Sequence, residues 1–204
     1  MPLVKGHSPT GAAAPSFPDR ASVVAALAGS DPARRRAAAR AAHTCADGVA
    51  LIARALAVEE DPSVAEGMIL ALVEIGGEDA AAALAPLLRS EDATRRFAAA
   101  EALRDAGDEA LSFFEALIRD DDPQVRIMAA EIARGPLGRT AAATLESLLP
   151  EEEEINVACA FIDVLSEIGT AATASVLRDF AARYPGKPYV RFTVDAALAL
   201  LPAE

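Results

Sequence analysis

The stretch DPQVRIMAAEIA, residues 122–133, is the clearest copy of a pattern that recurs along the whole chain. It begins with Asp122 at the expected N-cap and Pro123 at the first helical position. Proline has no backbone N–H, but this costs no hydrogen bond there, because N–H groups in the first turn have no partner within the helix. Counted from Val125, small or apolar residues recur three, four, seven and eight positions later, which defines one buried helical face. The stretch therefore predicts an amphipathic helix that begins at an acidic turn.

Related segments repeat at a nearly constant period. Aligned on the Val125 position, the equivalent residues are 30, 31, 30, 32 and 33 positions apart: Arg34, Val64, Arg95, Val125, Val157 and Val190. A period in this range is the signature of a repeat architecture. A second apolar helical pattern precedes each acidic turn, over residues 19–28, 47–58, 78–89, 109–119, 139–149 and 170–183.

Each period thus predicts two antiparallel helices, which we name the A helix (before the acidic turn) and the B helix (after it). No such pair can bury its apolar face alone, so the pairs must stack. We expect an all-α solenoid of about six helix pairs over residues 19–204, with B helices that end near Gly76, Gly107 and Gly169. Residues 1–18 contain four prolines and are expected to form a flexible tail.

Composition narrows the function classes. The chain has 204 residues, 4% aromatic residues, no Trp and a net charge of −12. Residues 1–44 carry +4 and the rest carries −16, so phosphate backbones are repelled and a nucleic-acid role is disfavoured. No stretch has the length and apolarity of a membrane span. Cys45 and Cys159 lie too far apart in sequence to suggest a disulfide framework, which favours the cytoplasm.

The segment at residues 122–133 resembles the HEAT-like repeat named after phycocyanobilin lyases, D-P-x-V-R-x-x-A-A-x-A-L. The resemblance extends over about residues 19–204 and is complete at Asp122, Pro123, Val125, Arg126, Ala129 and Ala130. The other repeats depart from it: Arg34 and Arg95 replace Val, Ala65 and Ala158 replace Arg, and Lys187 replaces Asp. The family includes bilin lyase subunits, adaptors and bacterial proteins without assigned activity, some of them encoded near signalling genes.

The resemblance also implies a role for the arginine that follows the Val-type position. In HEAT-like repeats this residue commonly pairs with an Asp of a neighbouring repeat, which predicts an inter-repeat ladder from Arg35, Arg96, Arg126 and Arg191. The acidic turns contain 13 carboxylates at residues 31, 59–61, 91–92, 120–122 and 151–154. We interpret them mainly as helix caps and solvated charge, with binding of a cation or basic partner as the alternative. The basic cluster Arg34, Arg35, Arg36 and Arg40 is read as the polar face of a terminal repeat.

The B helices offer a candidate binding surface, because they line the concave side of known α-solenoids. Positions two and five after the Val-type residue face away from the expected core. Position six holds Leu70, Glu101, Glu131 and Asp163, and position nine holds Arg104 and Arg134. The predicted partner-binding residues are Ile69, Phe97, Ile127, Glu101, Glu131, Arg104, Arg134, Ile162 and Phe192. The alternative, that neighbouring repeats cover this strip, stays open.

The sequence contains little that indicates a catalytic site. His43 and Cys45 are two residues apart and point to different sides of a helix, and the other histidine, His7, lies in the expected tail. Neither a zinc ligand spacing nor a Gly-rich phosphate loop is present in the sequence. We therefore expect a non-enzymatic adaptor that binds another protein without cofactor or metal and contacts neither nucleic acid nor membrane.

Two enzymatic alternatives come from the resemblance. A bilin-lyase-type accessory or catalytic subunit would need a tetrapyrrole cavity, which Cys159 or Glu131 could line. A HEAT-like DNA glycosylase is disfavoured, because it would need a basic concave face and aromatic stacking residues.

Overall fold

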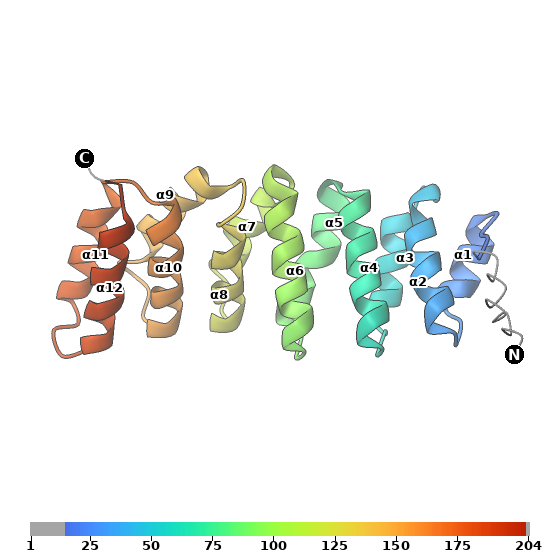
Figure 1. The fold of residues 1–204 in the computed structure, drawn as a ribbon, viewed down its shortest axis with the longest axis horizontal. Helices are drawn as coiled ribbons and strands as arrows, with labels where there is room; N and C mark the ends of the chain where they lie inside the picture. Colours follow the sequence, from blue (N-terminus) through green and yellow to red (C-terminus); the bar gives the residue numbers. More distant parts are fainter. Residues whose placement is uncertain (1–14, 203–204) are drawn as a thin grey trace, which may run out of the picture.

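The computed structural model describes residues 15–202 and shows six helix pairs stacked side by side in a single row (Figure 1). The A helices are α1 (Arg20–Leu27), α3 (Gly48–Leu56), α5 (Gly77–Leu84), α7 (Leu111–Leu117), α9 (Gly138–Leu148) and α11 (Thr173–Ala182). The B helices are α2 (Pro32–Ala41), α4 (Pro62–Ile75), α6 (Ala93–Ala106), α8 (Pro123–Ile132), α10 (Ile155–Ile168) and α12 (Pro188–Leu200). Three short 3₁₀ segments, η1 (Ala42–Thr44), η2 (Ala85–Arg89) and η3 (Gly107–Ala110), extend or precede these helices.

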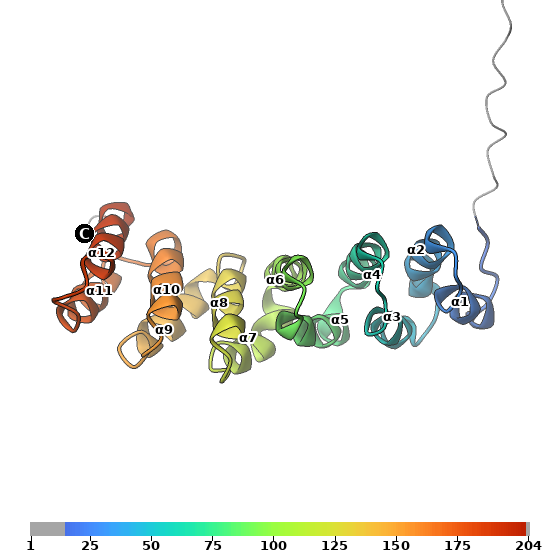
Figure 2. The same ribbon diagram turned by 90° about the horizontal axis from the view of Figure 1, so that it is seen from below.

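The predicted all-α solenoid is confirmed, and its row of pairs is gently curved. Figure 2 shows the A helices on the outer side of the curve and the B helices on the inner side. Adjacent B helices pack directly against each other from α2 to α12. Residues 1–14 of the expected tail lie outside the described residues, and α1 begins at Arg20. Within residues 15–202, no helix is long and apolar enough to cross a membrane.

Acidic caps start most of the B helices. The Asp122 carboxylate accepts a hydrogen bond of 2.8 Å from the backbone N–H of Gln124, which satisfies one of the unpaired donors at the start of α8. Equivalent bonds start α2, α4 and α6, from the side chains of Asp31, Asp61 and Asp92. The fifth and sixth B helices have Glu154 and Lys187 at the N-cap position, and neither side chain makes a capping hydrogen bond. The sequence pattern therefore located the helix starts, although the capping bond is present only in the first four.

Glycine ends three B helices, as predicted. Gly76 and Gly107 follow α4 and α6 with φ values of 67° and 60°, a left-handed conformation that costs little without a Cβ. Gly169 follows α10 in an extended conformation instead. There a Cβ would lie 2.4 Å from the carbonyl oxygen of Leu165, so close approach of the backbone is what requires glycine.

The core is one continuous layer between the A and B helices and between successive B helices. Leu72 and Leu103, eight positions after the Val-type residues, are fully buried against their A helices. In the first five B helices the residue five positions after is buried too, by the adjacent B helices: Ala39, Ile69, Ala100, Ala130 and Ile162 are at most 4% exposed, whereas Asp195 of α12 is exposed. The expectation that this row faces away from the core is therefore wrong, because each B helix from α4 to α10 has a B-helix neighbour on both sides and α2 has one at α4.

Candidate functional site

The inner face of the solenoid is formed by positions two, six, nine and ten after the Val-type residue of each B helix. On α4 and α6 these positions expose Leu70 (56%), Val73 (40%) and Phe97 (56%), which we call the apolar patch. Large side chains left in water on neighbouring helices mark a surface that another molecule can cover. Leu70 and Val73 were not among the predicted binding residues, although the apolar residue at position six was visible in the sequence.

The other apolar residues that the sequence predicted to bind a partner differ in their exposure to solvent. Ile69 and Ile162 lie in the layer between B helices and cannot contact a partner directly. Ile127 is half-buried and packs against the core, whereas Phe192 is 75% exposed on α12, at the far end of the row from α2. The structure thus separates the predicted strip into core residues and a smaller exposed set around Phe97.

A charged group occupies the inner face of α8 and α10, and we call it the acidic cluster: Glu131, Arg134, Asp163 and Glu167. The Arg134 guanidinium donates to Glu131 Oε2 at 2.8 Å, to Asp163 Oδ2 at 2.5 Å and to Glu167 Oε1. Burial alone would lower the pKa of Arg134, but its three carboxylate partners outweigh this and raise the pKa above its usual range. The cluster therefore keeps a fixed cation in its centre and an excess of two negative charges.

Arg104, the equivalent of Arg134 on α6, is less firmly held. It lies 3.9 Å from Glu101 and 3.3 Å from Asp105, both in its own helix. Side chains of Glu101 and Asp105 are 70% and 65% exposed, so these pairs contribute little to stability. The charged side chains of α6 (Glu101, Arg104 and Asp105) therefore border the apolar patch, and their ion pairs do not reach a neighbouring repeat.

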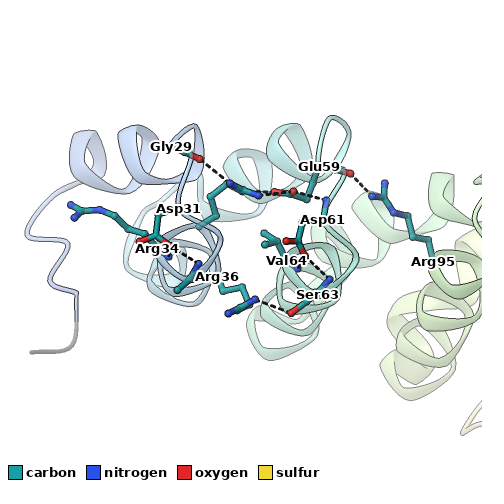
Figure 3. Close-up of polar contacts among 11 residues, drawn as sticks. Gly29, Asp31, Arg34, Arg36, Glu59, Asp61, Ser63, Val64 and Arg95 are labelled. Carbon is teal, nitrogen blue, oxygen red and sulfur yellow. Dashed lines mark hydrogen bonds and ion pairs between the residues drawn. The ribbon is translucent and has the colours of Figure 1, made fainter. Parts of the chain in front are cut away.

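The edge where A helices turn into B helices holds a second set of ionic contacts (Figure 3). Arg35 of α2 donates to both carboxylate oxygens of Glu59, at 2.7 and 3.0 Å, and to the carbonyl oxygen of Gly29 at 3.0 Å. Glu59 in turn accepts the backbone N–H of Asp61 at 2.9 Å, while Arg95 donates to the Glu59 carbonyl oxygen. The Glu59 carboxylate thus joins the turn of the second repeat to the first repeat. The backbone carbonyl of Glu59 joins the same turn to the third repeat.

A second contact of this geometry lies between the fourth and fifth repeats. Arg126 donates to both carboxylate oxygens of Glu152, at 3.0 and 2.9 Å, and to the Asp120 carbonyl oxygen at 2.7 Å. Glu152 accepts the backbone N–H of Glu154 at 2.8 Å. The ladder inferred from the resemblance is therefore present at Arg35 and Arg126, with Glu rather than Asp as the acid.

The ladder is not complete at the two other arginines. Arg96 donates to the carbonyl oxygens of its own turn, at Ser90 and Glu91, and the acid of the next turn, Asp120, is bound by Arg89 of η2 instead. Arg191 is exposed and lies 3.7 Å from Asp195 in its own helix. These two predicted inter-repeat contacts are therefore wrong.

Where the arginine is missing, the acid is missing as well. Ala65 occupies the arginine position of the second repeat, and the next turn has Ser90 at the position that Glu59, Asp120 and Glu152 occupy in their turns. Ala158 and Pro185 show the same joint loss between the fifth and sixth repeats. Because an unpaired buried charge is costly, losing both partners together avoids a penalty that losing one would incur.

These contacts account for about half of the 13 turn carboxylates. Four of them cap helices, and three (Glu59, Asp120 and Glu152) accept the backbone N–H of the cap residue. The remaining six are exposed: Glu60, Glu91, Asp121, Glu151, Glu153 and Glu154. Across residues 15–202, no group of three or more His, Cys, Asp or Glu side chains is arranged to hold a metal ion. Capping and solvation thus suffice to explain the turn carboxylates.

The histidine and cysteines do not come together. His43 is exposed, and its Nδ1 lies 2.7 Å from the carbonyl oxygen of Arg40. Both cysteines are free and half-buried. Burial raises the pKa of the Cys159 thiol, with Thr193 of α12 acting in the opposite direction, so the thiol is not activated as a nucleophile.

A groove on the outer side of the first two repeats was not anticipated from the sequence. It has a volume of about 690 Å³ and lies between α1 and α3, with Val24, Leu27, Leu51 and Val58 as apolar walls and the Arg35–Glu59 pair at one end. Val58 is 80% exposed at its rim. Sequence periodicity could not reveal this groove, because it depends on how far the first two A helices stand apart.

Comparison with known proteins identifies the repeat. The family described as HEAT repeats matches residues 21–104 and 110–199. No curated protein matches the chain. Among solved structures, an engineered protein is 20% identical and aligns over 87% of this chain and 94% of its own, with a TM-score of 0.40. The archaeal HEAT-like repeats protein from Thermococcus onnurineus NA1 is 16% identical over 88% of this chain and 85% of its own, with a TM-score of 0.47. Because the family match extends over most of its length, this chain belongs to the HEAT repeat family.

Proposed function

We propose that this protein is a non-enzymatic adaptor that binds another protein on the inner face of its solenoid. The observation that carries the proposal is the apolar patch: Leu70 and Phe97 are each 56% exposed on neighbouring B helices. A rigid stack of helices holds these side chains in place before the partner arrives, so little conformational entropy is lost on binding. Aromatic anchors with polar surroundings are the usual energetic centre of such interfaces.

Three finer proposals rest on the sequence: the family and the signalling role on the resemblance over about residues 19–204, and the location on the lack of a disulfide framework. We place the chain among the repeats named after phycocyanobilin lyases, and we propose a cytoplasmic role in bacterial signalling. The bilin-lyase alternative gains no support from Cys159, whose half-buried thiol lies beside Thr193 between two B helices.

The test compares variants of the apolar patch with a matched variant of the outer side. Leu70→Ala with Phe97→Ala truncates the two largest side chains of the patch, whereas Val58→Ala shortens an apolar side chain that is 80% exposed in the turn after α3. We expect proteins captured from native lysate by the wild type to be retained by the Val58 variant and lost with the double variant. Because all three side chains are exposed, melting temperatures should stay close to that of the wild type. Unchanged capture by a folded double variant would disprove the proposal.

A further inference from the structure

The inner face has two chemically different halves that lie in line. The apolar patch occupies α4 and α6, and the acidic cluster occupies α8 and α10, the next two B helices of the row (Figure 1). A segment that crosses the B helices along the inner face therefore meets apolar side chains first and carboxylates afterwards.

The acidic cluster has carboxylate oxygens that can bind a basic side chain. Glu131, Asp163 and Glu167 each use one oxygen on Arg134, and within residues 15–202 no hydrogen bond reaches the second oxygen of any of them. Asp163 and Glu167 side chains are 68% and 56% exposed. Carboxylates with a free oxygen at a fixed position bind Lys or Arg with a charge-assisted hydrogen bond.

The charge on the inner face of α4 to α10 disfavours anionic partners. From α4 to α10 the inner face carries two arginines and seven acids: Glu66, Glu74, Glu101, Asp105, Glu131, Asp163 and Glu167. Nucleic acid and a second copy of this chain, with its net charge of −12, are both repelled by such a surface. A basic segment is attracted to it.

A helical partner fits this surface better than an extended one. The inner face consists of helices, whose backbone groups are already paired, so it offers no strand edge for a partner to join. A helix satisfies its own backbone hydrogen bonds and needs only side-chain contacts.

We propose, resting on the adaptor function above, that the partner segment is a helix with an apolar cluster at one end and basic residues at the other. The structure sets their separation. From the middle of α4 and α6 to the middle of α8 and α10 is two interhelical spacings, or about 16–20 Å, since packed helices lie roughly 8–10 Å apart. At about 1.5 Å per residue, this places Lys or Arg about 11–13 residues from the apolar cluster on the same face of the partner helix.

The test uses a labelled synthetic helical peptide of that design, with Leu and Phe near one end and two Arg at the other, and measures binding by fluorescence anisotropy. One control peptide has Glu in place of Arg. A second has the same composition, with the Arg residues moved next to the apolar cluster. We expect the designed peptide to bind at least about 10-fold more tightly than either control. Equal binding of the second control would show general charge attraction only and would overturn the proposal.

Variants of the chain test the location. Asp163→Asn with Glu167→Gln should weaken binding of the designed peptide roughly threefold to tenfold and flatten its salt dependence, because two exposed ion pairs are lost. Glu78→Gln with Glu115→Gln removes the same charge from exposed positions on α5 and α7 and should leave affinity unchanged. Equal losses from both pairs of substitutions would contradict the proposed site.

The outcomes distinguish this proposal from the adaptor function. If the designed peptide fails to bind while the Leu70 and Phe97 variant still loses its captured proteins, the adaptor function holds and the proposed partner chemistry is wrong. If capture is unaffected by that variant, both fail.

Discussion

At the scale of single residues, the Arg35–Glu59 pair shows how two charged side chains can be buried where A helices turn into B helices. The Arg35 and Glu59 side chains are 15% and 6% exposed. Burial would raise the pKa of Glu59, but the hydrogen bonds from Arg35 and from the Asp61 N–H outweigh it and hold the pKa below its ordinary value. The carboxylate is therefore bound as an anion in the folded state, and its contribution to stability depends on pH.

Replacing Glu59 with Gln should lower the free energy of unfolding by about 1.5–3 kcal/mol at neutral pH, because Arg35 loses a charged partner. A carboxyl group whose pKa is depressed by folding stabilises the protein above its unfolded pKa of about 4.3, and this contribution is lost as the pH falls through the folded pKa. Urea unfolding at pH 7 and near pH 3 should thus show a gap between wild type and Glu59→Gln that shrinks in acid. Glu60→Gln, at the exposed neighbouring position, should change stability by less than about 0.5 kcal/mol at either pH. A gap independent of pH would contradict the ionic role.

Gly107 provides a second test at this scale. Its φ of 60° lies in the left-handed region, and a Cβ there would approach the Pro136 ring at 3.3 Å. We expect Gly107→Ala to destabilise the protein by roughly 1–2 kcal/mol. Gly186→Ala adds a Cβ that meets nothing within 4 Å, at a φ outside the left-handed region, and should be neutral or slightly stabilising. Thermal unfolding of both variants checks this, and equal effects would disprove the conformational argument.

At the scale of the helix, each B helix from α4 to α10 has three kinds of surface. One side packs on its A helix, two flanks pack on neighbouring B helices, and only a narrow strip faces the inner side of the curve. On α4 and α6, this makes Leu103 and Ile69 core residues and leaves Leu70 and Phe97 in water. Adjacent residues such as Ile69 and Leu70 therefore differ in role because they differ by about 100° around the helix.

Truncation of core and surface residues should separate these roles. Leu103→Ala and Ile69→Ala each leave a cavity and should cost roughly 2–5 kcal/mol in the free energy of unfolding. Leu70→Ala, next to Ile69 in sequence, should cost much less, because its side chain is already exposed. Chemical denaturation measures all three. If Ile69→Ala proves as mild as Leu70→Ala, the layer between B helices is not a core.

At the scale of the whole molecule, charge is distributed unevenly along the row. Residues 1–44 carry +4 and the rest of the chain carries −16, and the inner face of α4 to α10 shares this acidity. A curved, acidic surface attracts basic partners from a distance and repels polyanions.

The protein should accordingly fail to bind double-stranded DNA at physiological salt. A gel-shift assay with protein in the micromolar range should show no retarded band, because binding would have to overcome repulsion of the phosphates rather than release counterions from them. Retardation that disappears steeply with added salt would show that the basic first repeat acts as a phosphate-binding surface.

The sequence by itself determined the fold and most helix boundaries, because the repeat is local information. A cap such as Asp122, a proline after it and an apolar residue every three or four positions act within a single helix, and they repeat at a spacing of 30–33 residues. The A helices, the B helices and the glycines that end three of them were predictable for this reason. The ladder at Arg35 and Arg126 was predictable from the family resemblance.

Only the tertiary structure decided which residues reach the surface, because this depends on neighbours about 30 residues away. Ile69 and Phe97 both belong to rows that point away from the A helices, yet Ile69 is covered by an adjacent B helix and Phe97 is not. Likewise, the structure places Arg134 among carboxylates of two helices and opens a groove between α1 and α3. A periodic sequence specifies the direction in which a side chain leaves its own helix, whereas the distance and angle between stacked repeats determine what it meets there.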